Sequence, residues 1–85
     1  MAKYKIEILK TAQQEIERLP KKDIKAILHE IKNLSENPRG RNSIKLTGDE
    51  KYRLRVGRYR ILYEIHDNIL LVLVVKVAHR KEAYR

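Results

Sequence analysis

The chain of 85 residues contains no cysteine, and it has no apolar run approaching the roughly 18 residues of a membrane span. Without cysteine, disulfides and thiolate chemistry are excluded, so the fold must be held by packing and hydrogen bonds. The first residues, MAKYKIEILK, lack the apolar stretch and the small-residue cleavage site of a signal peptide. We therefore expect a cytoplasmic protein with no membrane association.

Acidic residues are also scarce, since 20 lysines and arginines stand against 11 aspartates and glutamates and give a net charge of +9. Such an excess attracts polyanions, with nucleic acid the usual partner, although a basic surface that serves only solubility stays an alternative. With 42% hydrophobic residues, the chain can build one thin core and no second domain. We expect a single domain over residues 1–85.

Two helices are expected after a first strand. Residues 3–9 alternate apolar and polar side chains, which predicts a strand with one buried face. Thr11 and Gln14 have the spacing of a capping box, so a first helix is expected to start there and to end near Leu19, before Pro20. A second helix follows, because apolar residues then recur at spacings of three and four. They are Ile24, Ile27, Leu28, Ile31 and Leu34.

A basic loop over residues 37–42 stops the second helix with Pro38 and Gly40. We interpret its Arg39 and Arg41 as ordinary loop charges. Residues 43–46 can start a further strand, and residues 47–50 form a turn.

Residues 52–65, YRLRVGRYRILYEI, have the pattern of a β-hairpin whose two-residue turn is Gly57 and Arg58, with glycine where a type II′ turn requires it. This turn places three apolar or aromatic pairs on one side of the sheet. The pairs are Val56 with Tyr59, Leu54 with Ile61, and Tyr52 with Tyr63. Arg53, Arg55 and Arg60 then share the other side, with Arg55 opposite Arg60. Facing like charges destabilise a strand pair by a few tenths to about 1 kcal/mol, so stability does not explain them.

The last strand, within residues 68–80, is almost continuously apolar, which predicts a central strand covered on both faces. A two-residue turn at Asp67 and Asn68 would bury Lys76, so we prefer a three-residue turn that begins at His66. The preferred register pairs Tyr59 with Val75, Ile61 with Leu73, and Tyr63 with Leu71. It brings Lys76, Ala78 and Arg80 to the arginine side, together with an apolar strip that a partner protein could cover. The strip consists of Leu62, Val72 and Val74.

The order of elements predicts an α+β fold of two layers, in which two N-terminal helices pack on one face of a mostly antiparallel sheet of four to five strands. The arginine side stays open, and a cationic sheet face with aromatic residues suits single-stranded RNA. Such a face could also support metal-free RNA cleavage, in which the 2′-hydroxyl attacks the adjacent phosphate. Arginine can neutralise the developing charge but cannot take up a proton, since its pKa stays above about 12.

Proton transfer then stays open among Tyr84, His79, Lys76 and Glu64. The three histidines, His29, His66 and His79, are too scattered for a metal site, and no glycine-rich phosphate loop precedes a helix, so neither a metal nor a cofactor is expected. His29 and His66 are expected in solvent. The final residues, AHRKEAYR, gather a histidine, cations and a tyrosine, for which a frayed basic tail is the alternative to a site.

The segment KLTGDEKYRLRVGRYRILYEI, followed by an apolar strand and HRKEAYR, resembles the RelE branch of the RelE/ParE toxin superfamily. The similarity covers essentially the full length, including the early LP between the two helices and the NP after them. It implies a fold related to microbial ribonucleases and a toxin that cleaves mRNA in the ribosomal A site without metal. It also implies an antitoxin that wraps the toxin and blocks its site.

The resemblance also assigns residues. The phosphate-stabilising arginine of the family falls on Arg60, the second catalytic arginine on Arg80, and the stacking C-terminal tyrosine on Tyr84. Two positions that are lysines in the best-known branch are Arg53 and Arg55 here, and arginine is a poor substitute if one of those lysines acts as proton acceptor in the family. Contacts with ribosomal RNA or mRNA are implied for Lys45, Arg58, Lys76 and His79. The heads of Arg60 and Arg80 are expected in solvent.

Two alternatives remain open beside the ribosome-dependent nuclease. One is a ParE-like inhibitor of DNA gyrase, which shares the fold but needs no cationic pocket. The other is a catalytically inactive RNA-binding relative, for which the arginines at positions 53 and 55 are the main argument.

Overall fold

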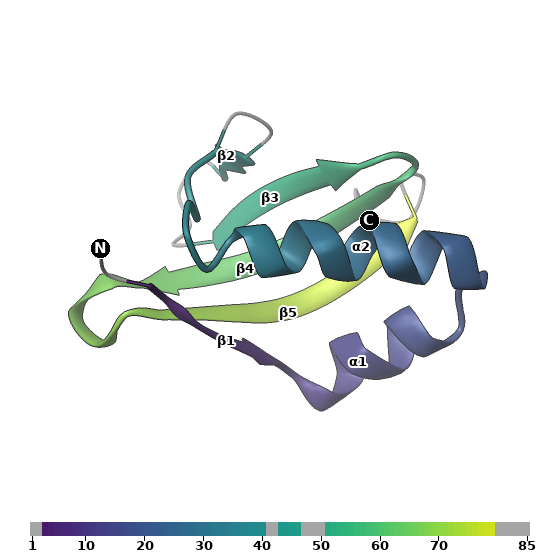
Figure 1. The fold of residues 1–85 in the computed structure, drawn as a ribbon, viewed down its shortest axis with the longest axis horizontal. Helices are drawn as coiled ribbons and strands as arrows, with labels where there is room; N and C mark the ends of the chain where they lie inside the picture. Colours follow the sequence, from purple (N-terminus) through teal and green to yellow (C-terminus); the bar gives the residue numbers. More distant parts are fainter. Residues whose placement is uncertain (1–2, 41–42, 47–50, 80–85) are drawn as a thin grey trace.

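The computed structural model describes residues 3–40, 43–46 and 51–79, and it confirms the predicted two-layer α+β fold. The strands are β1 (Lys5–Ile8), β2 (Ser43–Lys45), β3 (Lys51–Val56), β4 (Tyr59–His66) and β5 (Leu71–His79), and the helices are α1 (Lys10–Glu17) and α2 (Lys21–Asn33). The sheet has the order β1-β5-β4-β3-β2, in which β1 runs parallel to β5 and the other pairs are antiparallel. Both helices cover the same face of this sheet (Figure 1). In the described part of the chain, no helix is long and apolar enough to span a membrane.

The first helix begins earlier than predicted, and the expected capping box of Thr11 and Gln14 is wrong. α1 starts at Lys10 with Leu9 as its N-cap, and no side chain caps it. The reason is that β1 runs directly into the helix: Leu9 still donates its N–H to Val74 O of β5 at 2.9 Å, while its carbonyl accepts the N–H of Gln13. Strand pairing thus decides where the helix starts.

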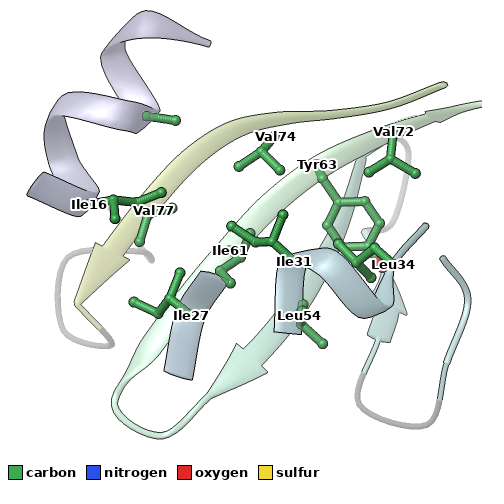
Figure 2. Close-up of a cluster of buried hydrophobic side chains, with 11 residues drawn as sticks. Ile16, Ile27, Ile31, Leu34, Leu54, Ile61, Tyr63, Val72, Val74 and Val77 are labelled. Carbon is green, nitrogen blue, oxygen red and sulfur yellow. The ribbon is translucent and has the colours of Figure 1, made fainter. Parts of the chain in front are cut away.

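The core lies between the helices and the sheet (Figure 2). It contains Ala12 and Ile16 of α1, Ile27 and Ile31 of α2, Leu34, and Leu54, Ile61, Tyr63, Val72, Val74 and Val77 of the sheet. Leu28, predicted in the apolar stripe, is 45% exposed and lies outside this core. Tyr63 is fully buried, and its hydroxyl donates to Pro38 O at 2.6 Å and is hydrogen-bonded to Ser43 Oγ at 2.7 Å. Burial raises the pKa of Tyr63, so its hydroxyl stays protonated and fixes the loop after α2 to β4.

The hairpin of β3 and β4 has the predicted register. Val56 pairs with Tyr59, Leu54 with Ile61 and Tyr52 with Tyr63. Gly57 has a φ of 56°, whereas no positive φ occurs at Arg58, as a type II′ turn requires.

The predicted register of β4 with β5 is wrong. The connection is a 3₁₀ turn, Asp67–Ile69, followed by Leu70 with a φ of 50°, so His66 pairs with Leu71 and Tyr63 with Val74. The register then shifts between Leu62 and Tyr63, so that Leu62 faces Lys76 and Tyr59 faces His79.

The register shift is a β-bulge that keeps a charge out of the core. Without it, the pairing of His66 with Leu71 would continue to place Lys76 opposite Ile61, which is fully buried against the helices. With it, Lys76 lies beside Leu62 on the opposite face, and Val77 takes the buried position opposite Ile61.

The expected apolar strip changes with this register. Val72 and Val74 are fully buried on the helix side, so their predicted place on the arginine side is wrong. Leu71 and Leu73, paired with His66 and Glu64, take their place beside Leu62 on the sheet face that the helices leave uncovered. We call this the open face.

Candidate nucleic-acid interface

Arg53, Arg55 and Arg60 lie together on the open face, as the hairpin pattern predicted. Arg55 pairs directly with Arg60, and Arg53 pairs with Leu62, so the three side chains leave β3 and β4 on the same side. All three lie toward the Gly57–Arg58 turn, and we call this group the cationic end. Farther from the turn, the same face carries opposite charges in alternation, with Lys51 facing Glu64 and Lys5 bound to Glu7 at 3.7 Å. Positive charge is therefore concentrated at one end of the sheet.

Arg60 is only 5% exposed, so the expectation that its head lies in solvent is wrong. It lies in the middle of the sheet, between Arg55 of β3 and Ala78 of β5. Burying a cation is costly, and a like charge directly opposite adds to the cost. Arg55, by contrast, is exposed. The pair thus combines one guanidinium held within the sheet with one that reaches solvent.

The other predicted cations differ in their surroundings. Lys76 joins the open face, but Glu15 of α1 holds its Nζ at 3.0 Å. The second oxygen of the same carboxylate accepts the N–H of Val77 at 2.9 Å, at the part of β5 beyond its last pair with β1. Arg58 is exposed in the hairpin turn. Lys45, on edge strand β2, pairs with Tyr52 and therefore belongs to the helix side, away from the cationic end.

Of the described candidates for proton transfer, Lys76 alone lies near the cationic end, in the same row of the sheet as Arg53 and Leu62. Glu64 shares a strand with Arg60 but lies four residues farther on, about 13 Å along a strand, and is bound to His66 at 2.9 Å. His79 lies on the helix side, where its ring meets Tyr59 edge-on with centroids 5.8 Å apart. Lys76 is held by Glu15, as described above. Arg80 and Tyr84, the remaining predicted site residues, lie outside the described residues.

The opposite end of the sheet contains a polar cluster that sequence reasoning missed. Arg39 donates to both carboxylate oxygens of Asp67, at 2.7 and 3.2 Å, and its Nε donates to the hydroxyl of Tyr52 at 3.1 Å. Tyr4 also donates to Asp67, at 2.5 Å. The hydrogen bonds from Arg39 and Tyr4 lower the pKa of Asp67 from 3.8 to about 2. Arg39, predicted as an ordinary loop charge, therefore ties the loop after α2 to the β4–β5 connection, whereas Arg41 lies outside the described residues.

The described histidines are not grouped as metal ligands. His29 is exposed on α2, as expected, and His66 is half-buried at the end of β4 beside Glu64. Within residues 3–40, 43–46 and 51–79, no three His, Asp or Glu side chains are close enough to hold a metal ion.

Known proteins are similar to this chain in sequence and in fold. A family model described as the ParE toxin of the type II toxin-antitoxin system parDE matches residues 6–84. RelE1 of Methanocaldococcus jannaschii is 29% identical over 87 residues, which span 98% of this chain and 97% of that protein.

Two solved toxin–antitoxin complexes contain similar chains, each with a TM-score of 0.81. The RelBE2 complex of Mycobacterium tuberculosis has a chain 27% identical, with 93% of this chain and 100% of that chain covered. The archaeal RelE–RelB complex of Pyrococcus horikoshii contains a chain that is 26% identical, with 95% of this chain and 99% of that chain covered.

Proposed function

The chain belongs to the RelE/ParE family of toxins from type II toxin–antitoxin systems, and from this premise we propose that it is a ribosome-dependent endoribonuclease. It acts in the cytoplasm, where it cleaves mRNA in the ribosomal A site and so inhibits translation. Arg60, Arg55 and Arg53 bind and stabilise the scissile phosphate, and Arg80 and Tyr84 complete the site.

The observation that carries this proposal is the placement of Arg55 opposite Arg60 on the open face, with Arg53 on the same side. Phosphate oxygens gain negative charge as the 2′-hydroxyl attacks, and fixed guanidinium groups stabilise that charge with little reorganisation. A buried guanidinium is more effective than a solvated one, because water screens it less. The gathering of three arginines at the cationic end therefore supports the binding of a phosphate there.

The proton acceptor is a separate question, since arginine remains charged. His79 faces the helix side, Lys76 is bound to Glu15, and Glu64 lies far from Arg60 along β4. Of the remaining candidates we propose Tyr84 for proton transfer: as a phenolate it takes the proton of the attacking 2′-hydroxyl, and as the phenol it gives that proton to the leaving 5′-oxygen. A Tyr84→Phe variant separates the hydroxyl from the ring: full loss of cleavage supports proton transfer, and near-normal cleavage leaves the ring with a stacking role only.

The partner that follows from the family is an antitoxin. Solved relatives come from toxin–antitoxin complexes, and the open face carries apolar residues beside its cations. Leu62, Leu71 and Leu73 are half-buried there, and Ile44 of β2, opposite Arg53, is 55% exposed. An antitoxin that covers this face would bury the apolar residues and block the arginines at once.

A cell-free translation reaction followed by primer extension on the message tests the proposed activity. The purified chain should produce cuts at fixed codon positions only when ribosomes are translating. Arg18→Ala, which removes an exposed charge at the end of α1, is the matched control for the arginine variants and should cut like the wild type. Intact message in the presence of folded wild-type protein would overturn the nuclease proposal.

A ParE-like gyrase inhibitor is the second candidate, because the matching family model carries the ParE description. It predicts intact message and loss of supercoiling by DNA gyrase. A supercoiling reaction run with the same protein preparation distinguishes the two activities.

A further inference from the structure

A pocket of about 520 Å³ lies on the helix side of the sheet, between the first turns of α2 and the β3–β4 turn. This volume is in the range of sites that hold small ligands. Its wall includes Lys22 and Asp23 from α2, Arg58 from the turn, Tyr59 from β4 and His79 from β5. We call it the hairpin pocket.

The hairpin pocket and the cationic end are back to back. Tyr59 and His79 form a pair on the helix side, and the next pair along the strands, Arg60 and Ala78, belongs to the open face. Only the sheet and its two-residue turn separate the two surfaces. A strand of RNA held at the cationic end can therefore reach the pocket by passing around the turn.

The pocket contains groups that recognise both parts of a nucleotide. The rings of Tyr59 and His79 meet at an interplanar angle of 82°, which offers an aromatic wall, and bases stack on such rings in a sequence-tolerant way. The exposed cations Lys22 of α2 and Arg58 of the turn also line the pocket, and each can contact a phosphate.

Asp23 is the acidic residue of the pocket, and it influences how a nucleotide can bind there. One carboxylate oxygen accepts the hydroxyl of Tyr59 at 2.8 Å, which holds the ring against α2. A carboxylate can accept further N–H groups, such as those on the edge of a base, and it repels a phosphate. A phosphate in the pocket is therefore favoured at Lys22 and Arg58 and disfavoured at Asp23.

We propose that the hairpin pocket binds one nucleotide of RNA that lies outside the cleaved position, with its base against Tyr59 and His79 and its phosphate at Lys22 and Arg58. The nucleotide belongs to the mRNA or to ribosomal RNA, which both offer this chemistry. The inference rests on the proposed function for its biological meaning, since it adds a second RNA contact to the same toxin. The pocket itself can be tested without ribosomes.

The direct test is an NMR titration of the full-length, ¹⁵N-labelled chain with 5′-AMP, and separately with ribose 5-phosphate, which lacks the base. We expect saturable shifts at residues that line the pocket with 5′-AMP, and at least about fivefold weaker binding of ribose 5-phosphate, the lower end of what one base stack contributes. Lys22→Ala and Arg58→Ala should each weaken 5′-AMP binding by about threefold to tenfold, because each removes one phosphate contact. Lys25→Ala is the matched control, since Lys25 is an exposed lysine of α2 that does not line the pocket, and it should bind like the wild type.

Two results would overturn the proposal. The first is the absence of saturable shifts at the pocket up to high millimolar 5′-AMP in a folded sample. The second is equal weakening by Lys22→Ala and Lys25→Ala, which would indicate a general charge effect. A cleavage assay with the same variants distinguishes the two proposals. If the wild type cleaves mRNA but binds no 5′-AMP at the pocket, only the pocket proposal is wrong. If it binds 5′-AMP at the pocket but does not cleave mRNA, only the nuclease proposal is wrong.

The source of the nucleotide is read from the same cleavage assay. If Lys22→Ala and Arg58→Ala alter which codons are cut, the nucleotide belongs to the mRNA. If they lower cleavage equally at all codons, it belongs to ribosomal RNA. Cleavage by both variants indistinguishable from that of Lys25→Ala would contradict a role in the reaction from either source.

Discussion

Arg55 and Arg60 lie directly opposite each other across β3 and β4, on the sheet face that the helices leave uncovered. Arg60 is buried and Arg55 is exposed, so the sheet holds two guanidinium groups side by side where a neutral pair would be more stable.

The cost of this pair can be measured. Arg55→Thr removes the like charge and introduces a β-branched residue that suits a strand, so the free energy of unfolding should rise by about 0.5 kcal/mol. Lys45→Thr is the control, because Lys45 is an exposed strand residue opposite Tyr52 with no facing cation, and it should change stability less. Urea denaturation followed by circular dichroism compares the two. A loss of stability in Arg55→Thr would show that this arginine serves the fold.

Glu15 connects α1 to the β5 strand through two different interactions. Glu15→Ala removes the acceptor of the buried Val77 N–H, so we expect a loss of about 1 to 2 kcal/mol in unfolding free energy. Glu15→Gln keeps a carbonyl oxygen for that N–H and loses only the contact with Lys76, so its cost should stay below about 1 kcal/mol. Denaturation curves of both variants, with the exposed Glu17→Gln of α1 as control, separate the two contributions. Equal losses in Glu15→Gln and Glu15→Ala would assign the effect to the ion pair instead.

The contact between Glu15 and Lys76 also influences RNA binding. Glu15→Gln should free the ammonium group of Lys76 on the open face and strengthen binding of a short single-stranded RNA by about twofold to fivefold at low salt. Glu17→Gln changes the net charge equally without touching Lys76. The same gain in both variants would mean that only net charge matters.

Asp67 makes stability depend on pH. Its pKa is lowered from 3.8 to about 2 in the folded chain by Arg39 and Tyr4, so the folded state releases the proton more readily than the unfolded state. The stabilisation is therefore complete above pH 3.8 and is lost as the pH falls toward 2. Urea midpoints of the wild type and Asp67→Asn should differ at pH 7 and converge at pH 2. In an Arg39→Gln background, the difference in urea midpoint that Asp67→Asn causes at pH 7 should be smaller. A difference between wild type and Asp67→Asn that stays constant at all pH values would contradict the assignment of this pH dependence to Asp67.

Gly57 tests the hairpin turn itself. A Cβ at Gly57 would meet no atom within 4 Å, so any cost of Gly57→Ala comes from the positive φ of 56° and should be about 1 kcal/mol. Gly40→Ala is the control, since its Cβ would lie at an ordinary 3.5 Å from Asn37 Nδ2, and it should stay within about 0.5 kcal/mol. Thermal unfolding of the two variants measures the difference, and an equal effect would mean that the turn does not demand glycine.

Local patterns predicted much of this fold. The alternation in residues 3–9 and the glycine at position 57 specify a strand and a turn through neighbouring residues alone, and the shared side of Arg53, Arg55 and Arg60 follows from them. The register of β5 could not be predicted in the same way. Its apolar residues occupy both faces, so several registers bury a similar apolar surface. No pattern in the sequence predicts the bulge that places Lys76 on the open face.

Contacts between distant segments could not be predicted from the sequence either. Arg39 and Asp67 are 28 residues apart in loops, where no periodicity links them. The burial of Arg60 and the hairpin pocket both depend on how the layers assemble, which the alternation of one strand does not determine. Sequence thus predicted which side of the sheet carries the arginines, but not how deeply each lies.

We propose that the cationic end serves the cleavage of RNA. The most direct measurement compares ribosome-dependent cleavage by Arg60→Ala with that of the wild type and Arg18→Ala, at equal concentrations of folded protein. We expect Arg60→Ala to cut more slowly by on the order of tenfold to several hundredfold, as for the loss of one transition-state contact, while Arg18→Ala cuts at the normal rate. Cleavage by folded Arg60→Ala within twofold of the wild type would contradict the account.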